Sequence, residues 1–221
     1  MRLFLLLRNV LMDMLKNNND TMKMLLELRK LGIIDHKILS AITNYKREEF
    51  LPKRLKGLSE EDISLQIFDG VETTSLSDLA KMIFLVLKNN KRTNLVLEIG
   101  TASGMLTAVL SAIYNRVYSL EINKEAYDFS SSILKNYSSK ILLRLGDGKK
   151  GWKEVAPFDA IYIDSCVTDD IVELLKDQLN ENGILVFAKK YLDKQFYCLE
   201  GKKSNTLLYK SVFQVNRTML I

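Results

Sequence analysis

The spacing of hydrophobic and polar positions changes partway along this chain. In the first part, apolar residues recur every three to four positions, which predicts helices over residues 21–30, 35–45 and 76–87. From residue 95 onward, short apolar runs alternate with amphipathic stretches. This alternation is typical of a parallel sheet with helices packed on both faces and right-handed crossovers between the strands.

The second part of the chain predicts a regular order of elements. Strands are expected over 95–99, 117–121, 141–145, 158–163 and 183–187, with helices over 105–113, 124–136 and 169–179. Two last strands, over 195–199 and 206–215, are joined by a polar turn and predict an antiparallel hairpin at one sheet edge. The predicted fold class is therefore α/β: a doubly wound, mostly parallel, Rossmann-like sheet with N-terminal helices and an antiparallel C-terminal hairpin.

The length of 221 residues fits one α/β domain with a short extension. We expect residues 1–20 to be an N-terminal extension and 21–221 to be a single domain. This domain divides into a helical region over 21–90, a cofactor-binding core over 91–190 and a hairpin region over 191–221. Residues 47–74 form a long, less periodic connection inside the helical region, and long connections are often functional.

The segment 95–104 carries the strongest functional signal. Its apolar strand contains Glu98 and leads into a turn with Gly100 and Gly104, after which a helix is predicted. Glycine lets backbone N–H groups approach a ligand closely, and the following helix directs its positive end toward the same place. Glu121 ends the next strand about 20 residues further on, where a carboxylate can accept both hydroxyls of a ribose. Together these features predict a site for a nucleotide-like cofactor.

Two more acidic positions follow predicted strands. Asp147 lies between two glycines after the strand 141–145, where its carboxylate can accept a hydrogen bond from the amine of adenine. Asp164 follows the strand 158–163, whose carboxyl end is expected to open onto the same crevice. A capping or loop role remains an alternative for Asp164.

The composition limits which partners and which kinds of site are expected. Lys and Arg exceed Asp and Glu by 32 to 27, a net charge of +5, which favours acidic substrates or surfaces without requiring nucleic acid. Cys166 and Cys198 have no paired spacing, so neither a disulfide framework nor a zinc site is indicated and a cytoplasmic location is expected. His36 is the single histidine and lies in a polar stretch that opens a helix. No metal site is expected. No membrane span is expected either, because the apolar N-terminal run is too short to cross a bilayer.

From about residue 22 to 189 the chain resembles the protein-L-isoaspartate (D-aspartate) O-methyltransferases, a class I family that uses S-adenosylmethionine. The resemblance is carried, in order, by residues 31–33, 47–52, 96–104, 117–122, 146–148, 151–152 and 156–161. It implies methyl transfer from S-adenosylmethionine to the carboxylate of isoaspartyl residues in damaged proteins, which begins their repair. An isoaspartyl carboxylate is already ionised at neutral pH and can attack the methyl group without a general base. This suits a chain without histidine or cysteine machinery.

The resemblance also implies the site residues. Thr74 and Ser75 would contact the acceptor, and the cofactor would be held by Glu98, Gly100, Thr101, Ala102, Ser103, Gly104, Glu121, Ile122, Gly146, Asp147, Gly148 and Asp164. Ala102 stands where the family usually has glycine. The segment 70–78 lacks the glutamines and the proline of the family's substrate-binding segment, and Glu72 would place a negative charge near an anionic acceptor.

Two other functions stay open. The altered segment 70–78 also fits a methyltransferase that acts on a small molecule or an RNA, although nucleic acid is not the expected partner. The strand 159–164 is similar to that of metal-dependent O-methyltransferases, but residues 186–190 lack the Asp-Asn pair that such enzymes need. Ala102 and Glu72 favour a third possibility, a non-enzymatic relative that keeps the fold and binds the cofactor.

Overall fold

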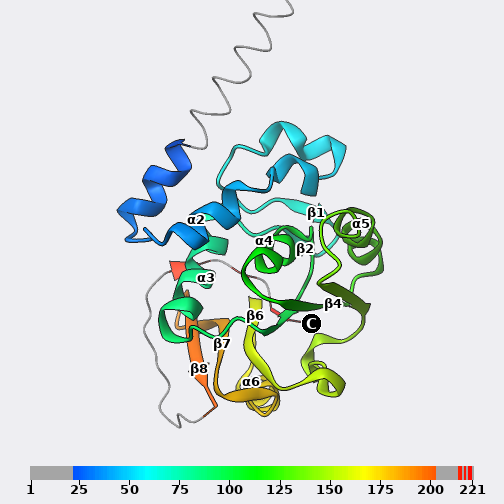
Figure 1. Cartoon of the computed structure of the whole chain (residues 1–221). Coiled ribbons are helices and arrows are strands. Elements are labelled where there is room, and N and C mark those ends of the chain that lie inside the picture. Colours follow the sequence, from blue (N-terminus) through cyan, green and yellow to red (C-terminus); the bar gives the residue numbers. More distant parts are fainter. Residues whose placement is uncertain (1–21, 203–213, 216, 218, 221) are drawn as a thin grey trace, which may run out of the picture.

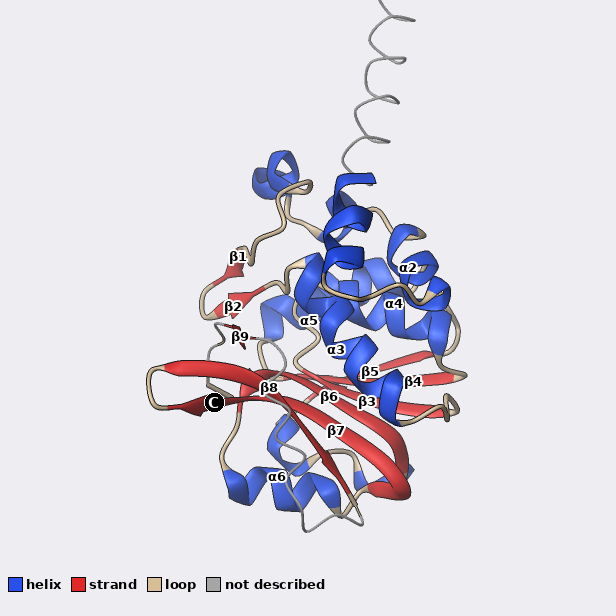
Figure 2. Cartoon of the chain, turned by 90° about the vertical axis from the view of Figure 1, so that its left-hand side faces the viewer, coloured by secondary structure: helices blue, strands red, loops and turns tan. Residues whose placement is uncertain are grey.

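The computed structural model describes residues 22–202, 214–215, 217 and 219–220. The expected extension over 1–20 and most of the expected strand over 206–215 lie outside the described residues. At the centre is a seven-stranded sheet with the strand order β5-β4-β3-β6-β7-β8-β9 (Figure 2). In the described part of the chain no helix is both long and apolar enough to cross a membrane.

Five of the seven strands run parallel to one another, as the alternation of apolar runs predicts. These are β3 (Leu95–Ile99), β4 (Arg116–Glu121), β5 (Ile141–Leu145), β6 (Phe158–Cys166) and β7 (Leu179–Tyr191). The chain builds outward from β3 to β5 and then returns to place β6 on the other side of β3. This reversal makes a crevice at the carboxyl ends of β3 and β6, which is where open α/β sheets bind ligands.

The helices form a layer on each side of the sheet (Figures 1 and 2). On one face lie α2 (His36–Thr43), α3 (Leu76–Asn89), α4 (Met105–Ile113) and α5 (Lys124–Leu134), preceded by a helix over 22–30, and on the other lies α6 (Asp169–Lys176). Successive residues of β3 alternate between two cores. Val96 belongs to the core under α2, α3 and α4, whereas Leu97 belongs to the core that includes α6. Burial on both faces explains why β3 is a continuous apolar run apart from Glu98.

The C-terminal hairpin is confirmed, but its arms differ from the expected ones. β7 continues past the expected end at Phe187 to Tyr191 and pairs with β8 (Lys194–Gly201), which is antiparallel to it. The short strand β9 (Gln214–Val215) then pairs antiparallel with β8. The apolar pattern ends after Ala188, which is still buried, because the last part of β7 leaves the core: Tyr191 is 72 % exposed. Hydrophobic spacing therefore marks only the buried portion of this strand.

The long connection over 47–74 has more structure than its irregular pattern indicates. Two 3-10 helices, Arg47–Phe50 and Lys53–Leu58, lead into a small antiparallel ribbon of β1 (Gln66–Phe68) and β2 (Val71–Glu72). Gly70 turns the ribbon with a φ of 67°, and the Asp69-Gly70 pair is a sequence signal for such a turn.

The buried Arg47 side chain holds this connection in place. Its guanidinium donates to the carbonyl oxygens of Glu61 and Ile63 and, over 3.2 Å, to Thr73 Oγ1. Backbone carbonyls that a loop would otherwise leave unpaired are thereby satisfied. The ribbon and the start of α3 are thus fixed above the crevice of the sheet.

Candidate functional site

A cavity of about 460 Å³ opens at the carboxyl ends of β3, β4 and β6. The sheet and its turns contribute Ile99, Gly100, Ala102, Glu121, Ile122, Asn123, Asp164 and Ser165 to its walls. The ribbon β1–β2 and the residues after it contribute Asp69, Gly70, Val71, Glu72, Thr73 and Thr74. Ser64, Arg217, Met219 and Leu220 complete the lining. One cavity therefore collects residues from the predicted cofactor core, the predicted acceptor segment and the C-terminus.

The two glycines of the turn after β3 serve different purposes. Gly100 has a φ of 90°, and a Cβ added there would have no atom within 4 Å, so the position faces open space in the cavity. Gly104 has a φ of 85° and precedes α4, but a Cβ there would lie 3.0 Å from the Leu134 side chain of α5. The first glycine leaves room for a ligand, and the second lets two helices pack closely.

The Glu121 carboxylate holds this turn from the end of β4. One oxygen accepts the backbone N–H of Ala102 and the other accepts the backbone N–H of Asn123, each over 2.8 Å. Ala102 has a φ of 46°, in the left-handed region that glycine adopts more readily. Ile122 is 57 % exposed and adds an apolar surface to the cavity wall.

Glu98 lies beneath the turn and not in the cavity wall. It is 1 % exposed, and its Oε2 accepts hydrogen bonds from Thr107 Oγ1 and, over 2.8 Å, from Ser119 Oγ. Its other oxygen, Oε1, has no hydrogen-bond partner in the part of the chain that the structure describes. Burial raises the pKa of Glu98 to about 8, against the opposing effect of these two hydrogen bonds. Glu98 thus joins β3, β4 and α4 from below the turn that follows β3.

Thr101, Ser103 and the segment 146–148 surround the cavity without lining it. Thr101 Oγ1 bonds to Ser119 Oγ over 2.6 Å, and Ser103 Oγ accepts the backbone N–H of Met105 at the start of α4. Asp147 accepts the backbone N–H of Lys149 over 2.9 Å.

The glycines beside Asp147 also stay outside the cavity wall. A Cβ on Gly148 would lie 2.2 Å from Cγ2 of Ile99, and Ile99 does line the cavity. On Gly146 the nearest atom to a Cβ would be Leu120 Cδ2, 3.8 Å away. Gly148 packs closely on Ile99, so the Ile99 side chain lies between this turn and the cavity.

The structure separates the two hydroxyls of the predicted acceptor segment. Thr74 lines the cavity, and its Oγ1 donates to Asp164 Oδ2 over 2.5 Å. Ser75 is 5 % exposed and does not line the cavity; its Oγ accepts the backbone N–H of Asp78 and caps α3. Of the two, only Thr74 is in a position to meet a ligand in the cavity.

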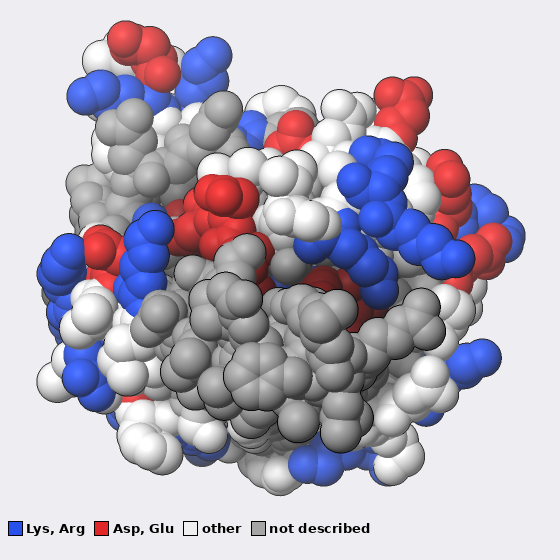
Figure 3. All heavy atoms as spheres, turned by 90° about the horizontal axis from the view of Figure 1, so that it is seen from above, with Lys and Arg blue, Asp and Glu red and all other residues white. Residues whose placement is uncertain are grey.

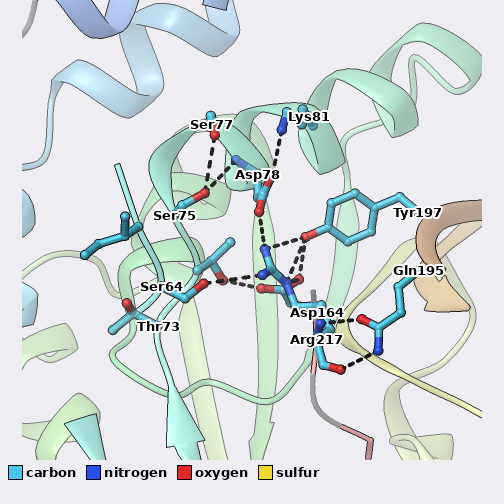
Figure 4. Close-up of polar contacts among 12 residues, drawn as sticks. Ser64, Thr73, Ser75, Ser77, Asp78, Lys81, Asp164, Gln195, Tyr197 and Arg217 are labelled. Atoms are coloured by element: carbon cyan, nitrogen blue, oxygen red, sulfur yellow. Dashed lines mark hydrogen bonds and ion pairs between the residues drawn. The ribbon is translucent and has the colours of Figure 1, made fainter. Parts of the chain in front are cut away.

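Arg217 comes to this cavity from the C-terminal end of the chain (Figure 4). Its guanidinium donates to Asp164 and, over 2.6 Å, to Asp78 Oδ2, and it contacts Tyr197 OH and Ser64 Oγ at 3.0 Å and 3.3 Å. Burial by itself would lower the pKa of Arg217, but Asp164, Tyr197 and Asp78 together raise it. Among the described lysines and arginines, Arg217 alone lines the cavity.

Sequence reasoning missed Arg217, Asp78 and Tyr197. Arg217 lies 53 residues beyond Asp164 and 139 beyond Asp78. No local motif marks any of the three, so no spacing rule would have joined them. The Gln195 side chain completes the arrangement, because its Nε2 donates to the backbone carbonyl of Arg217 over 2.9 Å.

A glycine turn after the first parallel strand, an acid at the end of the second and a cavity at the switch point define an α/β enzyme that binds a nucleotide-containing cofactor. The chain belongs to the protein-L-isoaspartate (D-aspartate) O-methyltransferase family, whose model matches residues 18–217. The predicted methyltransferase class and the family resemblance are thereby confirmed.

Curated relatives match most of the chain. The protein-L-isoaspartate O-methyltransferase of Chlorobium limicola is 34 % identical over 165 residues, which cover 75 % of this chain and 76 % of the relative. The enzyme of the same name from Caulobacter vibrioides is 37 % identical over 172 residues, with 76 % and 74 % covered.

Solved structures show the same fold. A putative protein-L-isoaspartate O-methyltransferase from Plasmodium falciparum, in complex with S-adenosyl-L-homocysteine, superposes with a TM-score of 0.73 at 22 % identity, covering 90 % of this chain and 97 % of that one. A second protein-L-isoaspartate O-methyltransferase has a TM-score of 0.75 at 26 % identity, covering 90 % and 65 %. The Rossmann-like fold class predicted from the sequence is confirmed.

Proposed function

We propose that this protein transfers the methyl group of S-adenosylmethionine to the side-chain carboxylate of isoaspartyl residues in damaged proteins. The observation that carries the proposal is that Gly100 and Glu121, expected to hold the cofactor, line the same cavity as Thr74, expected to contact the acceptor. Methyl donor and acceptor would therefore meet in one cavity. Membership of the family supports this reaction over others of the fold.

The cavity fits S-adenosylmethionine on the side of β3 and β4. The space above Gly100 has room for the cofactor to approach the backbone, Glu121 stands where ribose hydroxyls need an acceptor, and Ile122 offers an apolar surface for adenine. Asp147 is proposed to meet the adenine amine from the neighbouring turn. When bound, the cofactor supplies a methyl group activated by its sulfonium charge.

The other residues of the predicted cofactor set are proposed to shape the site from behind. Glu98, Thr101 and Ser103 hold the turn and the start of α4 through buried hydrogen bonds. Gly104, Gly146 and Gly148 permit close packing around it. Ser75 is proposed to act through the start of α3, where it fixes the position of Thr74.

The acceptor chemistry requires no general base from the protein. A carboxyl side chain has a reference pKa near 4, so an isoaspartyl group is ionised at neutral pH and carries its own attacking electron pair. The protein then contributes placement of the carboxylate in line with the methyl group and exclusion of water. Thr74 and Arg217 lie at the acceptor end of the cavity and are the residues proposed to place it.

The charges of the cavity disfavour a nucleic-acid acceptor. Four carboxylates line it, those of Asp69, Glu72, Glu121 and Asp164. Figure 3 shows the molecule from above. On the surface seen in this view, acidic atoms lie between groups of basic atoms. A phosphate backbone is attracted by basic surfaces and repelled by acidic ones.

The cellular location is proposed from the cysteines. Cys166 and Cys198 are both unpaired and buried. Free thiols fit a reducing compartment, and we propose that the enzyme works in the cytoplasm.

Transfer of labelled methyl from S-adenosylmethionine to peptides tests the function. An isoaspartyl peptide and the same peptide with a normal aspartyl residue are compared, and cofactor binding is measured calorimetrically on the same preparation. We expect selective labelling of the isoaspartyl form. Cofactor binding without labelling of either peptide would contradict the proposed acceptor and point to a small molecule or to a binding role.

A further inference from the structure

The cavity presents an electrostatic problem for the proposed substrate. An isoaspartyl carboxylate must enter a space whose lining holds Asp69, Glu72, Glu121 and Asp164. Asp164 lies at the acceptor end, because it accepts a hydrogen bond from the Thr74 hydroxyl. Like charges at close range repel strongly in a partly buried site. A cation at this end is needed to offset Asp164.

Arg217 is that cation, and two carboxylates share it. It contacts Asp164, which lines the cavity, and Asp78, which belongs to the first turn of α3 and does not line the cavity. The side chains are only 7 % exposed for Arg217 and 14 % for each acid. Asp78 also pairs with Lys81 over 2.7 Å, so two cations share this acid (Figure 4). The two acids orient the guanidinium, and Asp78 also draws part of its positive charge away from the cavity.

Two neutral hydroxyls also contact the guanidinium, that of Tyr197, which does not line the cavity, and that of Ser64. Ser64 Oγ accepts from Nη1 of Arg217 over 3.3 Å, and Ser64 itself lines the cavity. A hydroxyl at this distance is a much weaker partner than a carboxylate, and arginine presents several N–H donors in a fork that matches carboxylate geometry. An anionic ligand therefore gains the most binding energy if it replaces the Ser64 hydroxyl as the hydrogen-bond acceptor of Arg217.

We propose, on the basis of the proposed function, that Arg217 is the specificity-determining residue for the acceptor. Its guanidinium binds the acceptor carboxylate on the side that now meets Ser64. Asp164 and Asp78 are positioning residues that hold the guanidinium, and Asp78 sets how much positive charge it presents. No bond is made or broken in this step, which concerns recognition only.

Two substitutions of opposite sign test the proposal. Arg217→Gln removes the cation, whereas Asp78→Asn removes a competing anion, keeps one oxygen that can accept the hydrogen bond from Arg217 and gives up the pairing with Lys81. Arg217→Lys keeps the charge but not the planar fork. Lys30→Gln, which removes one positive charge from an exposed helix outside the cavity, is the matched control. For each variant we measure KM and kcat with an isoaspartyl peptide and the affinity of that peptide for protein saturated with S-adenosylhomocysteine.

We expect Arg217→Gln to raise KM at least tenfold, Arg217→Lys to recover part of this loss and Asp78→Asn to lower KM two- to fivefold. Affinity for S-adenosylhomocysteine should change less than twofold in every variant. The proposal is overturned if Arg217→Gln leaves KM unchanged. It is also overturned if Asp78→Asn raises KM, because a merely structural network would weaken whichever partner is lost. That second result remains informative even if Arg217→Gln does not fold.

The binding measurement separates this inference from the proposed reaction. If the wild-type protein transfers no methyl group but binds the isoaspartyl peptide with an affinity that depends on Arg217, the reaction is wrong and the role of Arg217 stands. If the peptide is methylated and its affinity is the same in Arg217→Gln, the reaction stands and this inference fails. A peptide that neither binds nor becomes labelled contradicts both.

Discussion

Thr74 Oγ1 donates a hydrogen bond to Asp164 Oδ2 over 2.5 Å, which joins residues 90 positions apart in the chain. Thr74 comes from the segment just before α3 and Asp164 from the carboxyl end of β6. A hydroxyl has a single proton, so Thr74 cannot donate to Asp164 and to an acceptor carboxylate at the same time. Binding of the acceptor therefore requires the hydroxyl to rotate or the acceptor to be held by Arg217.

Substitution of Thr74 tests whether its hydroxyl serves the acceptor. Thr74→Val keeps the side-chain shape and removes the hydrogen bond that the hydroxyl is proposed to donate to the acceptor carboxylate. The loss of a hydrogen bond to a charged group is worth roughly 1.5–3 kcal/mol. We expect kcat/KM for an isoaspartyl peptide to fall by about one to two orders of magnitude, while Thr74→Ser keeps most of the activity. Steady-state kinetics with both variants measures this, and an unchanged kcat/KM in Thr74→Val would remove Thr74 from the acceptor site.

Substitution of Glu121 tests the cofactor side of the cavity. Its carboxylate accepts the N–H groups of Ala102 and Asn123 and lines the cavity where ribose hydroxyls are proposed to lie. Glu121→Ala should weaken the binding of S-adenosylhomocysteine by about 1–3 kcal/mol, because hydroxyls would be left unpaired. Calorimetry measures the effect, with Glu125→Ala in the first turn of α5 as the control. Equal affinity in both variants would show that Glu121 makes no cofactor contact.

The buried Glu98 predicts a pH dependence of stability. Burial raises its pKa from an ordinary 4.5 to about 8, so between these values the native state binds more protons than the unfolded state. The free energy of unfolding should therefore fall as pH rises from about 5 to about 8, by at most roughly 1.4 kcal/mol per pH unit from this group. Glu98→Gln should flatten this part of the profile. Urea unfolding at pH 5.5, 7 and 8.5 measures both proteins, and parallel profiles would contradict the assignment.

Two glycine substitutions should separate stability from cofactor binding. Gly148→Ala would place a Cβ 2.2 Å from Ile99, so we expect a loss of stability of roughly 1–3 kcal/mol. Gly100→Ala meets no atom within 4 Å, although its φ of 90° is unfavourable for alanine by about 1–2 kcal/mol, and its methyl group enters the cofactor space. Thermal unfolding with and without S-adenosylhomocysteine compares them. The ligand should stabilise Gly148→Ala but hardly stabilise Gly100→Ala, and the reverse order would contradict the cofactor position.

Local rules were enough for the β3 and β4 side of the cavity, where the cofactor is proposed to bind. The strand, turn and helix around Gly100 are consecutive in the sequence, and Glu121 ends the next strand, so backbone preference and strand order alone bring them together. The same rules could not rank Thr74 against Ser75, since both carry a hydroxyl beside α3. The start of the helix determines which hydroxyl faces the cavity. Ser75 caps α3, and Thr74 lies in the cavity wall.

The sequence by itself determined the sheet, its switch point, the family and the places of Gly100 and Glu121 beside each other in the cavity wall, because these depend on contacts between neighbouring elements. Only the tertiary structure decided the end of the cavity where the acceptor is proposed to bind. There Asp78, Asp164, Tyr197 and Arg217 meet from a helix, two strands and the C-terminal segment. The charge pairing that holds these residues together depends on their distance in space. The number of residues between them in the sequence does not predict that distance.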